Sequence, residues 1–136
     1  MIKREALMRD TSRCFGCGEQ NPIGLKLHMH IVDDKCVADF TPRPEHASYG
    51  DRMHGGLTST LLDEVMGDYV FHLAGKPAYT AKLDIRFRSA VIIGETVHLE
   101  GWVTAQRGRL FVTEGRVYHA DGSVAAEATG KIMVGK

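Results

Sequence analysis

The chain has 136 residues, and its 17 basic and 17 acidic side chains give a formal net charge of zero. This balance offers no basic surface of the kind that binds nucleic acid, so no nucleic-acid partner is expected. No run of about 18 apolar residues is present, so no membrane span is predicted. The first ten residues hold no apolar core long enough for a signal peptide, and three cysteines are too few for a disulfide framework, so a cytoplasmic protein is expected.

The first third of the chain predicts a short arm followed by two strands. Residues 1–13 are charged and predict a short helix or a loose arm, and residues 14–24 are rich in turn-forming residues. Apolar and polar residues alternate over 25–32, which predicts a strand, and a second strand is predicted over 35–40 after an Asp-Asp turn. Two prolines and a glycine predict a loop over 41–53.

One long helix is predicted from His54 to about Ala74, because apolar residues recur there at steps of three and four, and Gly75 and Pro77 end the pattern. Strands are predicted over 79–88, 96–105, 109–119 and 123–134, with an Asp-Gly hairpin signal before the last of them. Simple alternation over 79–88 places Thr80 on the same face as Lys82 and Asp84. Two strands, one helix and a run of antiparallel strands define an α+β fold in which one sheet curls around the helix.

The start of the helix is the strongest candidate for chemistry. His54-Gly55-Gly56 precedes an apolar segment, and a helix N-terminus offers unpaired N–H groups and a partial positive charge. Glycines there allow a ligand oxygen to approach the backbone, which predicts an oxyanion hole. Asp63, nine residues after His54, is a candidate base or nucleophile, although a charged residue on a helix often simply faces water.

The spacing of these groups predicts a site shared between two subunits. Eight residues of α-helix separate Gly55 from Asp63 by roughly 12 Å, too far for both to act on one carbonyl. Two antiparallel copies of the helix would bring the N-terminus of one beside Asp63 of the other, which predicts a dimer. His54 either acts on substrate or binds the backbone, and Thr80 either orients a water or serves only as a strand former.

Cys14-Phe-Gly-Cys17 is a single Cys-x-x-Cys motif. A structural zinc site usually needs four ligands. His28 and His30 lie on one face of the next predicted strand and could supply the two that the cysteines do not, but the spacing is irregular. A redox pair would need a strand-to-helix context that is missing here. A role in turn structure and packing is therefore expected, with no metal.

The sequence resembles the hot-dog-fold acyl-CoA thioesterases of the 4-hydroxybenzoyl-CoA thioesterase superfamily, phenylacetate-pathway type, in particular members similar to thioesterase superfamily member 4. The resemblance rests on His54-Gly55-Gly56, on Leu61-Leu62-Asp63 and on the run from Thr80 to Arg88, and it extends from about Cys14 to Met133. Many relatives carry Asn or Gln where residues 47–49 stand, and Pro where Ser89 follows Arg88. The resemblance implies one hot-dog domain over residues 1–136, with residues 1–13 as an arm, in homodimers that often pair into tetramers.

The resemblance also implies hydrolysis of an acyl-CoA thioester without a metal or other cofactor. Asp63 would be the base or nucleophile, and the N–H of Gly55 would polarise the carbonyl, supported by His54 and Thr80. Gly56 would shape the turn, while Ser48 and Arg88 would contact the substrate. The alternative function is a non-catalytic acyl-CoA-binding or regulatory module, although such a module would not need a carboxylate beside the thioester. The sequence does not define the acyl group, whose pocket is expected around Met66, Val70 and Phe71.

Overall fold

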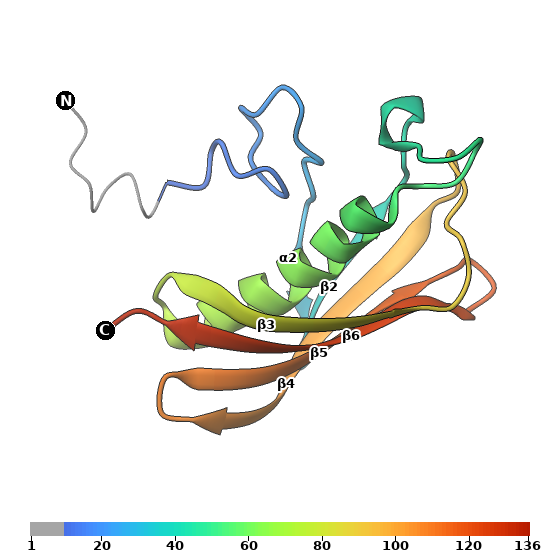
Figure 1. Ribbon diagram of the computed structural model, residues 1–136. Helices are drawn as coiled ribbons and strands as arrows, with labels where there is room; N and C mark the ends of the chain where they lie inside the picture. Colours follow the sequence, from blue (N-terminus) through green and yellow to red (C-terminus); the bar gives the residue numbers. More distant parts are fainter. Residues whose placement is uncertain (1–9) are drawn as a thin grey trace.

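One long helix lies across the inner face of a curved antiparallel sheet in the computed structural model, which describes residues 10–136 (Figure 1). The helix α2 spans Gly55–Ala74. The strands are β1 (His30–Val32), β2 (Lys35–Phe40), β3 (Ala78–Phe87), β4 (Val97–Arg107), β5 (Leu110–Tyr118) and β6 (Val124–Val134). A short 3-10 helix, η1 (Pro44–His46), interrupts the loop before α2. The predicted α+β class, with one sheet wrapped around one helix, is confirmed.

The six strands follow the order β1-β2-β4-β5-β6-β3, and every neighbouring pair is antiparallel. The strand that follows the helix, β3, therefore returns to the far edge of the sheet and pairs with the last strand, β6. The two edges differ in length, because β1 has 3 residues and β3 has 10. Two aromatic side chains on β3, Tyr79 and Phe87, are 48% and 55% exposed. The longer edge thus presents both free backbone groups and apolar surface.

The helix begins and ends where the sequence predicted. The side chain of His54 caps its N-terminus, and Gly75 ends it in the left-handed conformation at φ 66°. Its inward face supplies the centre of the core together with side chains of the sheet: Leu61, Leu62, Val65, Met66 and Val70 from the helix, and Leu99, Phe111, Val117 and Ile132 from the strands. Among residues 10–136, no helix is long and apolar enough to cross a membrane.

Helix and sheet lie very close together at Gly101 on β4. A Cβ atom at this position would lie 2.6 Å from the backbone carbon and oxygen of Val65. Neither atom can rotate away, so only glycine allows this contact between strand and helix.

The strand predicted over 25–32 is mostly wrong, because only His30–Val32 forms one. Lys26 takes a left-handed conformation at φ 55° and breaks the extended backbone. The N–H groups of Leu25 and Leu27 donate to the carbonyls of Phe15 and Gly16, at 2.8 and 2.9 Å. The alternation in this segment therefore reflects burial of the two leucines beneath the Cys-x-x-Cys loop, whereas the other strands lie within two residues of their predicted bounds.

The predicted faces of β3 are also wrong at its start. The register of β3 against β6 shifts between Thr80 and Lys82, so Ala81 is an extra residue in a β-bulge. Thr80 pairs with the buried Ile132, whereas Lys82 pairs with its neighbour Lys131. Thr80 therefore faces the helix, and Lys82 and Asp84 face the outside. Of the predicted arm at 1–13, residues 1–9 lie outside the described residues, and Asp10–Arg13 are not helical.

Candidate functional site

The turn before α2 is held by His54 itself. Its Nδ1 accepts a hydrogen bond of 2.9 Å from the N–H of Gly56, which places the proton of the neutral ring on Nε2. A Cβ atom on Gly56 would lie 3.0 Å from this Nδ1, so the close approach of the ring favours glycine there. Of the two readings of His54, the structure shows the backbone-binding one, with Nε2 left for any further contact.

Gly55 differs from Gly56 in the hydrogen bonding of its N–H and in the space for a Cβ atom. Its N–H donates to no group within residues 10–136. A Cβ atom there would meet only the ring of Phe87, at 3.6 Å, which is an ordinary contact. Packing within the protomer therefore does not require glycine at this position. A free N–H at the positive end of a 20-residue helix is suited to an oxyanion or a polarised carbonyl.

The predicted residues Gly55, Ser48 and Arg88 are brought together around one hollow of about 260 Å³, which Ser89 also lines. The hydroxyl of Ser48 donates to the carbonyl of Arg52 at 3.3 Å. The guanidinium of Arg88 forms an ion pair of 2.6 Å with Glu127, and both side chains are partly exposed. This ion pair raises the pKa of Arg88 and lowers the pKa of Glu127.

Asp63 and Thr80 meet at a second hollow. The bulge at Ala81 turns Thr80 toward the helix, and its hydroxyl donates to Oδ1 of Asp63 at 2.5 Å. The other carboxylate oxygen, Oδ2, accepts no hydrogen bond from the described residues. The hollow has a volume of about 360 Å³ and is lined mainly by Cys14, Cys17, Asp63, Glu64, Asp68, Phe71, Pro77, Tyr79 and Thr80.

No residue lines both hollows, so one protomer does not bring Gly55 and Asp63 together. This agrees with the roughly 12 Å that eight helical residues impose. Of the three residues around which the acyl pocket was expected, Met66 and Val70 are fully buried in the core of the protomer, and Phe71 lines the hollow beside Asp63. A hollow of about 380 Å³ on the outer face of the sheet, bordered by Asp84, Arg116 and Glu127, includes none of the predicted site residues.

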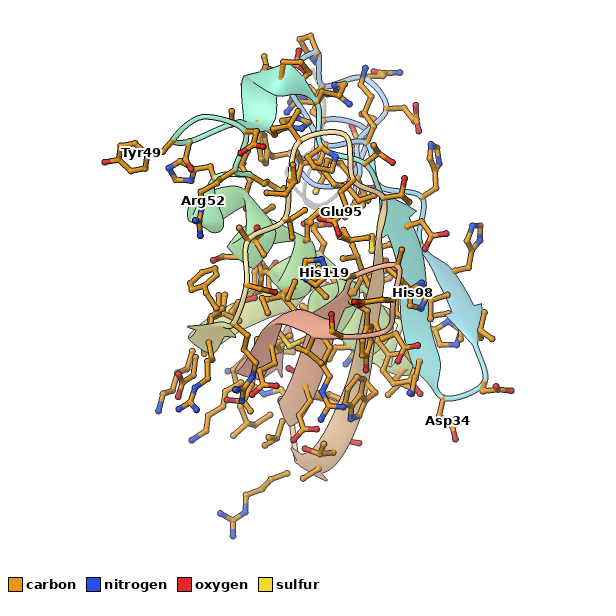
Figure 2. The ribbon with its side chains drawn as sticks, turned by 90° about the vertical axis from the view of Figure 1, so that its right-hand side faces the viewer. Asp34, Tyr49, Arg52, Glu95, His98 and His119 are labelled. Atoms are coloured by element: carbon orange, nitrogen blue, oxygen red, sulfur yellow. The ribbon has the colours of Figure 1, made fainter. Side chains whose placement is uncertain are left out.

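A polar network beside the Gly55 hollow was not predicted. His119, on the loop after β5, forms a hydrogen bond with each of its ring nitrogens. Nδ1 lies 2.6 Å from Oε2 of Glu95, and Nε2 lies 2.7 Å from Oγ of Ser89. Figure 2 shows Glu95 and His119 side by side. Burial raises the pKa of Glu95, but the hydrogen bonds from the N–H of Ile92 and from His119 outweigh burial and hold it below its usual value. Ser89, Glu95 and His119 fix the 89–95 loop that forms one wall of the hollow. Because His119 is far from the other two in the sequence, no sequence pattern predicted this contact.

The Cys-x-x-Cys motif lies against the helix, next to Asp63. The thiol of Cys14 is 3.7 and 3.9 Å from the two carboxylate oxygens of Glu64. Burial raises the pKa of Glu64, and burial together with the bond to Cys14 raises the pKa of Cys17 far above its usual value. The histidines considered as metal ligands from the sequence are not part of this cluster, since His28 is exposed and pairs with Glu19 at 3.2 Å.

Comparison with solved structures places this geometry in a known fold. A thioesterase superfamily protein known from its crystal structure is 26% identical, with a TM-score of 0.79, and the match covers 88% of this chain and 61% of that one, so the chain spans less than two thirds of that relative. Zebra fish thioesterase superfamily member 2 is 19% identical, with a TM-score of 0.77 and coverage of 99% and 100%. A Streptococcus mutans protein solved with acetyl CoA bound is 21% identical, with a TM-score of 0.73 and coverage of 80% and 88%.

These likenesses confirm the hot-dog fold that the resemblance implied. No curated protein matches the chain. The family model described as the thioesterase superfamily matches residues 50–126, which is more than half of the chain and includes the turn at His54, the helix and Thr80. The chain therefore belongs to the thioesterase superfamily.

Proposed function

We propose that the protein hydrolyses an acyl-CoA thioester to the free acid and CoA, in a homodimer whose two sites each combine residues of both protomers. The observation that carries this proposal is the pair of half-sites on one helix: a free N–H at Gly55 and a carboxylate at Asp63, each at its own hollow. Membership of the thioesterase superfamily supports the reaction class, and the acetyl CoA bound to the Streptococcus mutans protein supports the substrate class.

In this proposal the thioester carbonyl oxygen accepts a hydrogen bond from the N–H of Gly55 on one protomer. Asp63 of the other protomer then either removes a proton from a water that attacks the carbonyl carbon, or attacks this carbon itself and forms an acyl-aspartyl anhydride, which water hydrolyses to the free acid after CoA has left. The negative charge that develops on the oxygen is stabilised by the N–H and by the helix N-terminus. The CoA thiolate leaves readily, because a thiol has a pKa of about 8.5.

Thr80 acts as a positioning residue, because its hydroxyl holds Oδ1 of Asp63 and leaves Oδ2 for the reaction. His54 and Gly56 fix the turn that presents Gly55. Ser48 and Arg88 border the hollow of Gly55, and the partly exposed guanidinium of Arg88 is suited to a phosphate of the CoA moiety. The open edge of β3, with its exposed Tyr79 and Phe87, supports pairing of the two protomers there.

Complementation between two inactive variants tests the shared site. Asp63→Ala removes the carboxylate, and Gly55→Pro removes the N–H at the first helical position, where proline is tolerated. In a mixed dimer, one site receives both defects and the other receives neither. Heterodimers isolated through two different tags should therefore recover up to about half of the wild-type activity, measured as release of free CoA from a panel of short, medium, long and aryl acyl-CoAs.

Two controls separate the N–H from other effects. Gly55→Ala keeps the N–H and adds a methyl group that meets only Phe87, so it should retain most of the activity that Gly55→Pro loses. Heterodimers of two differently tagged Asp63→Ala chains should stay inactive. Inactive mixed dimers of Asp63→Ala with Gly55→Pro, or a fully active monomer, would show that the site is not shared.

A further inference from the structure

The Cys-x-x-Cys motif, for which the proposed hydrolysis has no use, forms a three-residue cluster with the helix. The Sγ atoms of Cys14 and Cys17 and a carboxylate oxygen of Glu64 all lie within 4.8 Å of one another. All three side chains are partly buried. The two cysteines come from the N-terminal segment, and Glu64 comes from α2, 47 residues after Cys17, so the cluster depends on the tertiary fold.

The loop is closely fitted around this arrangement. The N–H of Gly18 donates to the carbonyl of Cys14 at 2.8 Å and closes the turn. A side chain at Gly16 would overlap the side chain of Glu64, and one at Gly18 would collide with the backbone of Cys14. Both glycines are therefore needed for the loop to bring its two thiols down onto the carboxylate. Figure 1 shows this N-terminal segment passing over α2.

The charges around the cluster favour a cation. Among the described residues, Glu64 takes part in no salt bridge, and its side-chain hydrogen bonds come from the thiol of Cys14, which is a weak donor. Asp63 and Asp68 on the same helix line the same hollow. A partly buried carboxylate with acidic neighbours is stabilised by a bound cation more than by a neutral thiol.

The separation of Cys14 and Glu64 fits zinc. In a tetrahedral site with Zn–S of about 2.3 Å and Zn–O of about 2.1 Å, a sulfur and an oxygen ligand lie about 3.6 Å apart. The observed separations from Cys14 Sγ to the carboxylate oxygens of Glu64, 3.7 and 3.9 Å, are close to this value. Two sulfur ligands and one carboxylate favour zinc over magnesium or calcium, which prefer oxygen ligands alone.

We propose that Cys14, Cys17 and Glu64 bind one zinc ion, with a water molecule as the fourth ligand. Each thiol loses its proton as it binds, so the site carries two thiolates and one carboxylate. The ion joins the N-terminal loop to α2 at the rim of the hollow that Asp63 and Thr80 line. This site does not depend on the proposed hydrolysis. It replaces the expectation from the sequence that Cys14 and Cys17 hold no metal, and Glu64 stands in place of the histidines considered there as further ligands.

Metal binding to the full-length protein tests this proposal without any activity measurement. The protein is reduced, stripped with a chelator and titrated anaerobically with cobalt(II) and then with zinc(II). We expect a cobalt spectrum with a sulfur-to-metal charge-transfer band and the intense visible bands of a tetrahedral site, saturating near one ion per chain, and we expect zinc to abolish the spectrum. Zinc should also raise the melting temperature in a concentration-dependent way.

Variants identify the ligands. Cys14→Ser and Cys17→Ser should each weaken the charge-transfer band and lower zinc affinity at least tenfold, and Glu64→Gln, which preserves the shape of the side chain, should lower the affinity while keeping the sulfur band. His28→Gln and Asp68→Asn are matched controls that should leave the spectrum and stoichiometry unchanged. The absence of a cobalt spectrum in the reduced wild-type protein would overturn the proposal. It would also be overturned by binding that survives both cysteine substitutions, or by a disulfide between Cys14 and Cys17 whose reduction yields no metal-binding protein.

Discussion

Thr80→Val is the most informative change at the candidate site, because it alters the environment of Asp63 without touching the carboxylate. The hydroxyl of Thr80 donates the one side-chain hydrogen bond that Asp63 accepts from the described residues, at 2.5 Å. Valine has nearly the same shape and removes only the donor. A net hydrogen bond of this kind is worth about 0.5–1.5 kcal/mol, with water able to replace part of it because Thr80 is exposed. Since about 1.4 kcal/mol corresponds to a tenfold change in rate, kcat should fall about two- to tenfold.

The same reasoning sets a larger effect for Asp63→Asn. The amide keeps an oxygen that can accept from Thr80, but it provides neither a base nor a nucleophile, so kcat should fall about a hundredfold or more. Because Thr80 acts through Asp63, Thr80→Val should have almost no further effect in the Asp63→Asn background. Thr80→Ser restores the hydroxyl and should recover most of the activity.

The assay follows free CoA with a thiol reagent, using the best substrate from the acyl-CoA panel and subtracting the signal of the protein's own cysteines. Asp84→Asn is the matched control, because this carboxylate lies on the outer face of the same strand. Near-wild-type turnover of Asp63→Asn would refute the assigned role of Asp63. Additive losses from Thr80→Val and Asp63→Asn would refute the role of Thr80 as a positioning residue.

Two further predictions concern stability. Gly101→Ala should lower the free energy of unfolding by about 3 kcal/mol, because the added Cβ meets helix backbone at 2.6 Å. Gly67→Ala, on the partly exposed face of α2 where a Cβ meets no atom within 4 Å, should raise it by about 0.5–1 kcal/mol. Urea denaturation compares the two variants, and equal effects would contradict the close contact between β4 and α2. Burial lowers the pKa of His98, but hydrogen bonds to Asp39 and Glu100 at 2.9 and 3.1 Å outweigh burial and raise it above 6.5. Protonated His98 therefore stabilises the fold fully below about pH 6.5, and this contribution is lost as the pH rises through the higher pKa of the folded state. The stability difference between wild type and His98→Gln should accordingly be largest below about pH 6.5 and shrink as the pH rises above it, and a constant difference would contradict the raised pKa.

Sequence patterns predicted the helix and most of the strands because each of them carries strong local signals. The apolar spacing of α2 and its capping residues His54 and Gly75 fixed both of its ends, and hairpin residues such as Asp121 and Gly122 separated the last strands. Over residues 25–29 the same patterns predicted a strand, and this prediction was wrong. Alternating burial looks alike in a strand and in an irregular segment packed under a loop, and the left-handed Lys26 has no sequence signature.

The candidate site was predicted as residue types but not as contacts. Gly55 was predicted from the helix N-terminus, and Ser48 and Arg88 were predicted from the family resemblance; the fold places all three at one hollow. The bulge at Ala81 could not be predicted, because a period of two assigns Thr80 and Lys82 to one face, and only the register with β6 shows the extra residue. The contact of Glu64 with Cys14 spans 50 residues, and such a distance in sequence leaves no periodic trace.

The unequal edges of the sheet determine whether association through its strands can stop. A chain that paired β3 of each copy with β1 of the next would leave a free edge after every addition and would grow into an open filament. The 3 residues of β1 offer too little backbone for such head-to-tail pairing. Pairing of β3 with β3 of a second copy is a symmetric contact, so the long edges of both copies are used in the same interface. A sheet built in this way closes at two copies and leaves only the short β1 strands at its ends.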